Sequence, residues 1–175
     1  MCRIRNSCFS LNDLQRNGVC QTKQSTLLSI FVEIFVMIQF NYETNFELTE
    51  EEAHSKWIAS CLEQYGFRLG ELNYVFCDDA YLLKLNVEFL SHDTLKDIIS
   101  FDYSVRNELH GDVFISIETV RENAVYFNVD FEEELRRVLV HGVLHYCGYK
   151  DKTEEDENIM RSKEDEKLAM FHVEQ

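Results

Sequence analysis

A long amphipathic segment near the C-terminal end of the chain constrains the fold most strongly. Between Asp130 and Cys147 apolar residues recur every three or four positions, which predicts one helix that buries a single face. His141 and His145 are four residues apart, so both imidazoles project from the same side of this helix. Gly148 follows, and glycine suits a helix C-terminus because it adopts positive φ easily. The chain therefore needs a layered core on which this helix can lie.

The remaining sequence alternates between strand and helix patterns. Apolar runs predict strands at residues 37–43, 70–77, 96–104 and 111–117. Helical spacing predicts helices at residues 49–66, 78–90, 117–127 and 153–171. This order predicts an α+β fold with a single, mostly four-stranded mixed sheet, helices packed on it, and a metal site at the C-terminal end of the long helix.

Local signals mark where several helices begin. Thr49 with Glu52 predicts a capping box, Asp78 predicts an N-cap, and Thr153 followed by Asp156 resembles another cap. His54 is predicted to lie on a solvated face of its helix.

Length and composition indicate one acidic domain. The chain has 175 residues, 45% of them hydrophobic, which is enough for a substantial core. Its 32 acidic and 17 basic residues give a formal net charge of −15, which repels phosphate backbones at long range. Any contact with nucleic acid must then be confined to a small part of the surface or depend on a partner. The six cysteines form no C-x-x-C pair, which favours reduced thiols and a cytoplasmic location.

Residues 1–36 differ in character from the rest. They carry four basic and two acidic side chains, so the negative charge lies in residues 37–175. The apolar run from Leu27 to Phe40 is too short to span a membrane and contains Glu33. We therefore expect no membrane association, and the change in composition suggests a boundary between residues 1–36 and the rest of the chain.

The spacing of three side chains favours a metal site. His141, His145 and Asp151 form an H-x3-H-x5-D pattern, and two histidines with a carboxylate are a suitable set for a catalytic zinc ion. The alternative is that both histidines are ordinary polar residues near a helix C-terminus, where the helix dipole favours imidazolium. Gly142 stands where the H-E-x-x-H pattern of metalloproteases has its glutamate, which disfavours peptide hydrolysis.

Three ordered motifs resemble those of one family. The segment HGVLHYCGYKD is similar to the H-G-x-L-H-x-x-G-Y-D-H signature of the YbeY family. LNVEFLSHDTLKDIISFDYS at residues 85–104 and HGDVFIS at residues 110–116 resemble the family's upstream segments. The resemblance implies a zinc-dependent, single-strand-specific endoribonuclease that acts on ribosomal RNA precursors. Because family members begin near a strand like MIQFNYE, it also implies that residues 1–36 are an extension and that Met37 is the natural start of the domain.

The resemblance also implies specific residue roles. His141 and His145 match the first two zinc ligands of the family, and Asp151 stands where the third histidine belongs. The carboxylate remains a suitable ligand for one Zn²⁺ ion but also admits other divalent metals. Leu90 stands where many members have an arginine, so a positive partner for phosphate must come from elsewhere. The candidates are Lys96, His92 and Arg106.

Residues upstream of the long helix are weaker candidates. Asn86, Lys96 and Ser100 are candidates for a catalytic cleft, although an amide or a hydroxyl at such positions also serves as a cap or satisfies the backbone. Asp97 and Asp112 either orient a ligand imidazole or make turns.

Two further functions compete with the endoribonuclease. An acidic enzyme needs its RNA to be presented, and basic proteins of the small ribosomal subunit are the expected partners. A non-catalytic ribosome-assembly factor with a structural metal is the main alternative. A metal-dependent hydrolase of a smaller substrate is the third, although no phosphate-binding glycine loop supports it.

Overall fold

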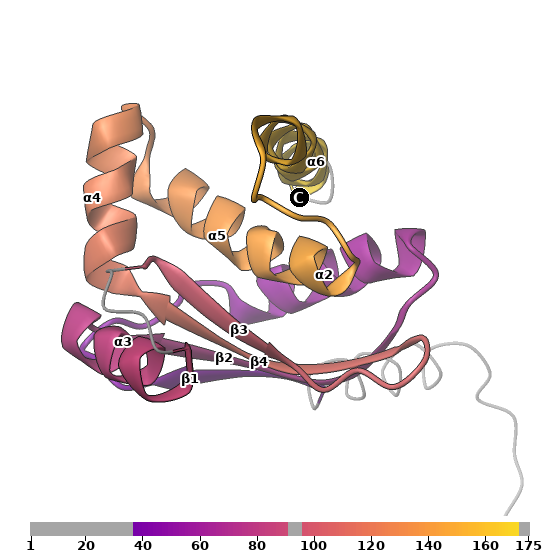
Figure 1. Ribbon diagram of the computed structural model, residues 1–175, viewed down its shortest axis with the longest axis horizontal. Coiled ribbons are helices and arrows are strands. Elements are labelled where there is room, and N and C mark those ends of the chain that lie inside the picture. The colour runs from indigo at the N-terminus through magenta and orange to yellow at the C-terminus, as the bar shows by residue number, and fades with distance from the viewer. Residues whose placement is uncertain (1–36, 91–95, 172–175) are drawn as a thin grey trace, which may run out of the picture.

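The computed structural model describes residues 37–90 and 96–171 and contains one four-stranded sheet (Figure 1). The strands are β1 (Ile38–Tyr42), β2 (Arg68–Cys77), β3 (Ile98–Asp102) and β4 (Glu108–Ser116), in the spatial order β1-β2-β4-β3. β1, β2 and β4 are parallel, and β3 runs antiparallel to β4. The predicted α+β class with a mixed sheet is confirmed.

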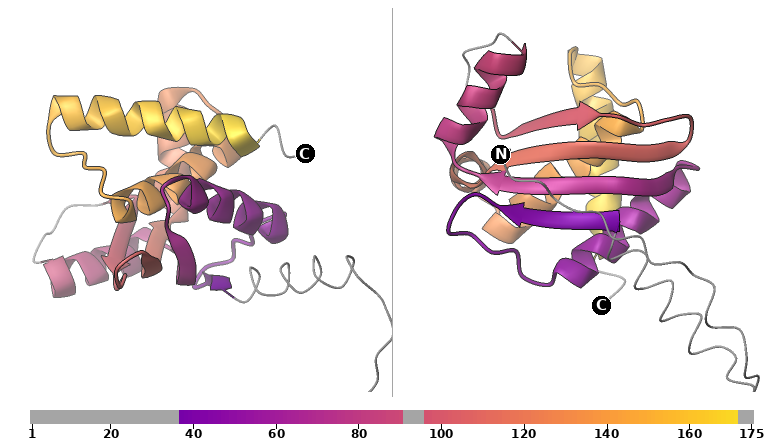
Figure 2. Two further views of the ribbon diagram at one scale, coloured as in Figure 1. Left: turned by 90° about the vertical axis from the view of Figure 1, so that its right-hand side faces the viewer. Right: turned by 90° about the horizontal axis from the view of Figure 1, so that it is seen from below.

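The described helices cover the sheet unequally. α2 (Glu51–Gln64) and α5 (Phe131–Tyr146) lie over one face, and α6 (Glu154–Phe171) crosses above them (Figure 1). α4 (Ile117–Phe127) stands beside one end of the sheet. α3 (Asp79–Leu85) and the π-helix η1 (Asn86–Leu90) lie near that end, and much of the second face is left open by the described helices (Figure 2).

The main core lies between the sheet and α5. Alternate residues of the central strands are fully buried on this face, namely Leu72, Tyr74, Phe76, Val113 and Ile115. They meet the apolar face of α5, and the Tyr74 hydroxyl donates to the Leu139 carbonyl oxygen at 3.2 Å. Each fully buried large apolar side chain contributes about 1.5–3 kcal/mol. The apolar spacing predicted for this helix therefore fixes its position on the sheet.

Two glycines allow α5 to approach the sheet closely. A Cβ atom at Gly142 would lie 3.1 Å from Ile98 Cδ1 and 3.3 Å from Val113 Cγ1. A Cβ atom at Gly111 on β4 would lie 2.5 Å from the Tyr146 hydroxyl. This approach places the C-terminal half of α5, with its two histidines, against β3 and β4.

Some local predictions hold and others are wrong. The Tyr81 amide donates to Asp78 at 2.8 Å, and the Asp156 amide donates to Thr153 at 3.1 Å, so both predicted caps are confirmed. The Thr49 capping box is wrong, because α2 begins after Glu50, which has a φ of 55° and makes no side-chain cap. The segment after Leu85 stays helical but changes to a π-helix.

The prediction for His54 is also wrong. Its side chain is only 1% exposed and its ring lies against Trp57 and Phe171, with ring centroids 6.5 and 5.0 Å away. The apolar surface of α6 covers this side of α2, and local spacing in α2 does not reveal that contact.

Predictions for residues 1–36 and His92 concern parts of the chain outside the described residues. Among residues 37–90 and 96–171, no helix combines the length and apolar character that crossing a membrane requires.

Candidate metal centre

The C-terminus of α5 ends in a turn of defined geometry. Gly148 has a φ of 93°, as its sequence position predicted. The Gly148 amide donates to the His145 carbonyl at 2.9 Å, and the Tyr149 amide donates to the Leu144 carbonyl at 3.1 Å. These two bonds form a Schellman motif, which reverses the chain direction after the helix. The turn carries Asp151 back towards the face of α5 that presents the histidines.

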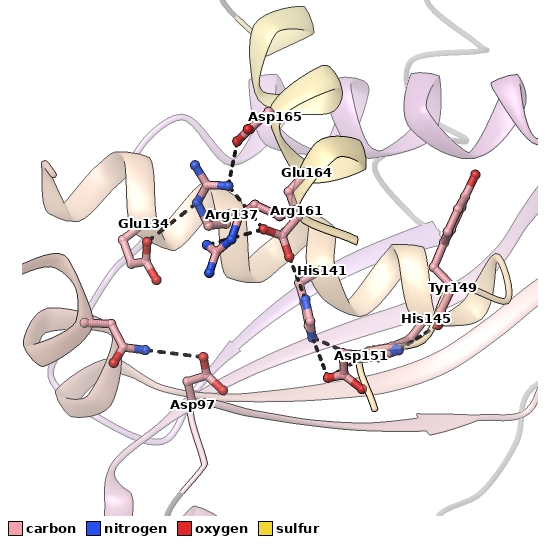
Figure 3. Close-up of polar contacts among 11 residues, drawn as sticks. Asp97, Glu134, Arg137, His141, His145, Tyr149, Asp151, Arg161, Glu164 and Asp165 are labelled. Carbon is pink, nitrogen blue, oxygen red and sulfur yellow. Dashed lines mark hydrogen bonds and ion pairs between the residues drawn. The ribbon is translucent and has the colours of Figure 1, made fainter. Parts of the chain in front are cut away.

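Three potential ligand atoms gather at this turn. His141 Nε2 lies 2.9 Å from His145 Nε2, and Asp151 Oδ2 lies 3.7 Å from the first nitrogen and 3.5 Å from the second (Figure 3). The ligand atoms of this group all lie within 4.8 Å of one another. His141, His145 and Asp151 therefore form a group that could hold a metal ion.

The other ring nitrogen of each histidine has a partner that determines the tautomer. His141 Nδ1 lies 2.8 Å from Glu164 Oε1, and His145 Nδ1 lies 3.0 Å from the carbonyl oxygen of Tyr149 (Figure 3). A carbonyl oxygen and an ionised carboxylate only accept hydrogen bonds, so each Nδ1 carries the hydrogen and donates. In neutral imidazoles the two Nε2 atoms then carry lone pairs and no hydrogen.

This arrangement is unfavourable without a positive charge between the ligand atoms. Two lone pairs face each other at 2.9 Å, and a carboxylate oxygen lies beside them. Neither nitrogen has a hydrogen to donate to the other, so the contact is repulsive for the neutral rings. A cation bound by all three atoms removes this repulsion, and metal-binding histidines typically use the other ring nitrogen as a donor in this way.

The spacing and exposure of the group fit one small divalent ion. Ligand atoms bound tetrahedrally to zinc at about 2.0–2.2 Å lie about 3.3 Å apart, and the three measured separations bracket this value. The side chains of His141, His145 and Asp151 remain 20%, 27% and 43% exposed. His141 and Asp151 line a pocket of about 370 Å³ next to α6. The group therefore supplies three ligands and leaves one side open to this pocket.

Glu164 is held by a set of buried charges behind His141. It is 4% exposed, and its second oxygen lies 3.1 Å from the Arg137 guanidinium. Arg137 also pairs with Asp165 at 2.8 Å and with Glu134 at 3.8 Å (Figure 3). Burial raises the pKa of Glu134, while Arg137 acts in the opposite direction. This arrangement keeps the Glu164 carboxylate oriented towards the imidazole.

Comparison with known proteins agrees with this geometry. The model of the family described as "Endoribonuclease YbeY" matches residues 38–172. The chain belongs to this family. A relative of that name from Flavobacterium johnsoniae is 63% identical over 139 residues, which cover 79% of this chain and 100% of the relative. A second, from Flavobacterium psychrophilum, is 61% identical and covers 79% and 99%. The chain is therefore an enzyme, as its sequence predicted.

A solved structure supports the fold independently of these relatives. The solution structure of a protein from Thermotoga maritima matches with a TM-score of 0.56 and covers 79% of this chain and 91% of its own. The two sequences are 22% identical, so this likeness concerns the YbeY fold alone.

The weaker site candidates lie elsewhere in this YbeY fold. Asn86 is 2% exposed at the start of η1, and Lys96 is exposed just before β3. Ser100 is half-buried on β3 and hydrogen-bonds to Tyr146, which follows His145 in α5. The hydrogen bonds that orient the two histidine rings go to Glu164 and the Tyr149 carbonyl. The three weaker candidates remain predictions.

Sequence reasoning missed the groups that orient the imidazoles. Of the two aspartates considered for this role, Asp97 accepts from Asn123 at 3.4 Å and Asp112 accepts from Asn73 at 2.8 Å. Glu164 and the Tyr149 carbonyl contact the rings instead. The sequence did hold a signal for the burial of Glu164. Apolar residues recur around it at helical spacing, at Met160, Leu168 and Phe171, and mark the buried face of α6.

Proposed function

We propose that this chain is a metal-dependent, single-strand-specific endoribonuclease of ribosomal RNA maturation, in which His141, His145 and Asp151 hold one zinc ion. The observation that carries the proposal is the pair of Nε2 atoms 2.9 Å apart beside Asp151, with both Nδ1 atoms engaged as donors. The printed names of the relatives, endoribonuclease, support the reaction class.

The residues of the chain prepare the site for phosphodiester hydrolysis. Glu164 and the Tyr149 carbonyl fix both tautomers and keep the ligand nitrogens directed at one point. The turn at Gly148 holds Asp151 opposite them. A bound divalent ion acts as a Lewis acid that polarises a phosphoryl oxygen and lowers the pKa of water. The adjacent pocket gives a phosphate group access to the open side.

The charge of the chain indicates how RNA reaches the site. A protein with a formal net charge of −15 gains little from counterion release on free RNA. We infer that the precursor is presented on the small ribosomal subunit in the cytoplasm, where basic ribosomal proteins complement the acidic surface. Free RNA should therefore be a poor substrate, and lowering the salt concentration should not improve it, because the long-range repulsion is then less screened.

A structural role for the metal is the alternative, and the exposure of the group argues against it. Structural zinc sites are closed by four protein ligands, whereas catalytic sites keep a position open. The group here has three ligand atoms, and it borders a pocket. A non-catalytic assembly factor would not require that open side.

Metal analysis combined with an RNA cleavage assay tests the proposal. Protein purified without added metal should contain about one zinc per chain by elemental analysis. Cleavage of a single-stranded RNA should stop with a chelator, return with zinc, and be absent in His141→Ala. Full cleavage by a metal-free His141→Ala protein would refute the proposal. A folded wild-type protein that binds zinc, associates with ribosomes and never cleaves RNA would favour the assembly factor.

A further inference from the structure

An arginine of α6 shares the pocket with two of the proposed metal ligands. The lining of the pocket of about 370 Å³ includes His141, Asp151 and Arg161, together with Glu157 and Glu164. In Figure 3, Arg161 lies above His141 and beside Glu164. A guanidinium and a proposed cation site thus border one space, which is the arrangement that a phosphate group requires.

The environment of Arg161 differs from that of its neighbour Arg137. The Arg137 side chain is 15% exposed and pairs with three carboxylates, so its charge is already used within the protein. The Arg161 side chain is 53% exposed, and its single ion pair within the described part of the chain is a distant one, 3.7 Å from Glu164. Its guanidinium lies over the ring of Phe127, 5.5 Å from the centroid. Arg161 is therefore held in place without its charge being neutralised.

We propose that Arg161 binds a backbone phosphate of the single-stranded RNA beside the metal site. The inference rests on the proposed function, because it takes RNA as the ligand of this pocket. Arg161 would be the positive partner for phosphate that is missing at position 90, where Leu90 stands in place of the family's arginine. Arg161 belongs to α6, whereas Leu90 is the last residue of η1.

The contacts of Glu164 allow Arg161 to turn towards a ligand. Glu164 keeps Arg137 at 3.1 Å and His141 at 2.8 Å when Arg161 leaves, so no buried charge is left unpaired. The pair between Arg161 and Glu164 is weak because its 3.7 Å separation exceeds hydrogen-bond distance, whereas a guanidinium fork on phosphate makes two charge-assisted hydrogen bonds. Transfer of Arg161 from Glu164 to a phosphate is therefore favourable.

The other cations near the site are less suitable. Lys163 is two residues away on the same helix but pairs with Glu166 at 2.7 Å and lines a different pocket with Glu154 and Ile159. Among the described residues, Lys96 makes no contact with the pocket that contains His141. Lys163 consequently offers a matched control, with the same change in charge on the same helix.

Binding and cleavage are measured in parallel on Arg161→Gln, Arg161→Lys and Lys163→Gln. The probe for binding is a fluorescein-labelled single-stranded 2′-O-methyl RNA, which resists cleavage, titrated into zinc-loaded protein at several salt concentrations. We expect Arg161→Gln to weaken binding about 10-fold and to reduce the slope of log K against log salt by about 0.7, the value for one lost phosphate contact. Arg161→Lys should retain the slope and lose part of the affinity, because it keeps the charge without the fork.

The outcomes separate this inference from the proposed function. Equal affinities and slopes for Arg161→Gln and Lys163→Gln, with unchanged melting temperatures, overturn the role of Arg161. If wild-type protein cleaves RNA and Arg161→Gln cleaves equally well, the proposed function stands and the inference is wrong. If wild-type protein binds the probe but cleaves no RNA, a selective loss of binding in Arg161→Gln still supports the phosphate contact. If wild-type protein neither binds nor cleaves RNA, whether free or presented on the small ribosomal subunit, both are wrong.

Discussion

Glu164 and His141 are 23 positions apart in the chain, yet a carboxylate oxygen of the first lies 2.8 Å from Nδ1 of the second. The contact joins α6 to α5 at a point where both side chains are largely removed from solvent. A carboxylate that accepts from an imidazole makes the opposite ring nitrogen a better ligand and fixes its direction. The packing of the last helix therefore orients His141, one of the proposed metal ligands.

Glu164→Gln should weaken metal binding, and it should also lower stability, because an amide NH2 then faces the Arg137 guanidinium in place of the oxygen that pairs with it. The amide oxygen still accepts from His141 but carries no full charge, so we expect zinc affinity to fall about 10- to 100-fold. Competition with a chromophoric zinc chelator measures this change. Asp165→Asn is the matched control, because Asp165 contacts Arg137 and not the imidazole. Equal zinc affinities for the two variants would mean that the contact between Glu164 and His141 stabilises only the packing of α6 on α5.

Asp151→His should narrow the range of metals that the site accepts. Imidazole suits zinc, whereas a carboxylate also suits manganese and magnesium. We expect the variant to bind zinc at least as tightly as wild type and to lose manganese-supported activity relative to zinc-supported activity. Titration of metal-free protein with each ion, followed by an activity assay, measures the ratio of manganese-supported to zinc-supported activity. An unchanged ratio would show that the third ligand does not set the metal preference.

The fold was predictable because each element carries its own local signal. The alternation of Ile38–Tyr42 and the 3.6-residue spacing of Phe131–Tyr146 depend only on which faces are buried. The start of α2 was not predictable in the same way. Glu50 adopts positive φ and no side chain caps the helix, so the capping signal at Thr49 had no effect. The burial of His54 depends on Phe171, more than a hundred residues later, and leaves no local trace.

The candidate site was predictable in part for a similar reason. His141, His145 and the turn at Gly148 lie within one helix end, so their spacing alone implies that they converge. The roles of Glu164 and Arg161 depend on how α6 crosses α5, which helical periodicity does not encode. Glu164 could have been suspected from its place among buried neighbours, whereas the exposed Arg161 resembles any other charged residue of that helix.

Gly111→Ala should destabilise the protein and disturb the end of α5. The added methyl group would lie 2.5 Å from the Tyr146 hydroxyl and 2.9 Å from the Phe101 carbonyl oxygen, and the carbonyl belongs to the paired strand and cannot move freely. Overpacking of this kind costs about 1–3 kcal/mol. Urea denaturation of metal-free protein measures the loss. If Tyr146 relieves the clash by moving α5, zinc affinity also falls because His145 precedes it; unchanged stability would show that the sheet absorbs the methyl group.

His54 should make stability fall as the pH drops below neutrality. Burial lowers the pKa of its imidazole below the ordinary value of 6.5, and Nε2 has no hydrogen-bond partner among the described residues. Between the folded pKa and 6.5, the unfolded chain binds a proton that the folded protein excludes. The contribution of His54 to the free energy of unfolding then decreases with falling pH by at most about 1.4 kcal/mol per pH unit. Above pH 6.5 this contribution is constant.

His54→Phe isolates that contribution, since it keeps a ring against Trp57 and Phe171 and removes the titrating group. The free energy of unfolding of both proteins is measured in urea from pH 8 to pH 5, with a chelator present so that bound metal does not contribute. The two proteins differ only at residue 54, so the pH dependence of the difference reports the ionisation of His54 together with its coupling to nearby charges. We expect the stability of the variant relative to wild type to increase as the pH falls below 6.5. If the difference in the free energy of unfolding is the same at every pH, the folded protein accommodates the charged imidazole of His54. Burial of the unpaired Nε2 atom would then not disfavour the charged form.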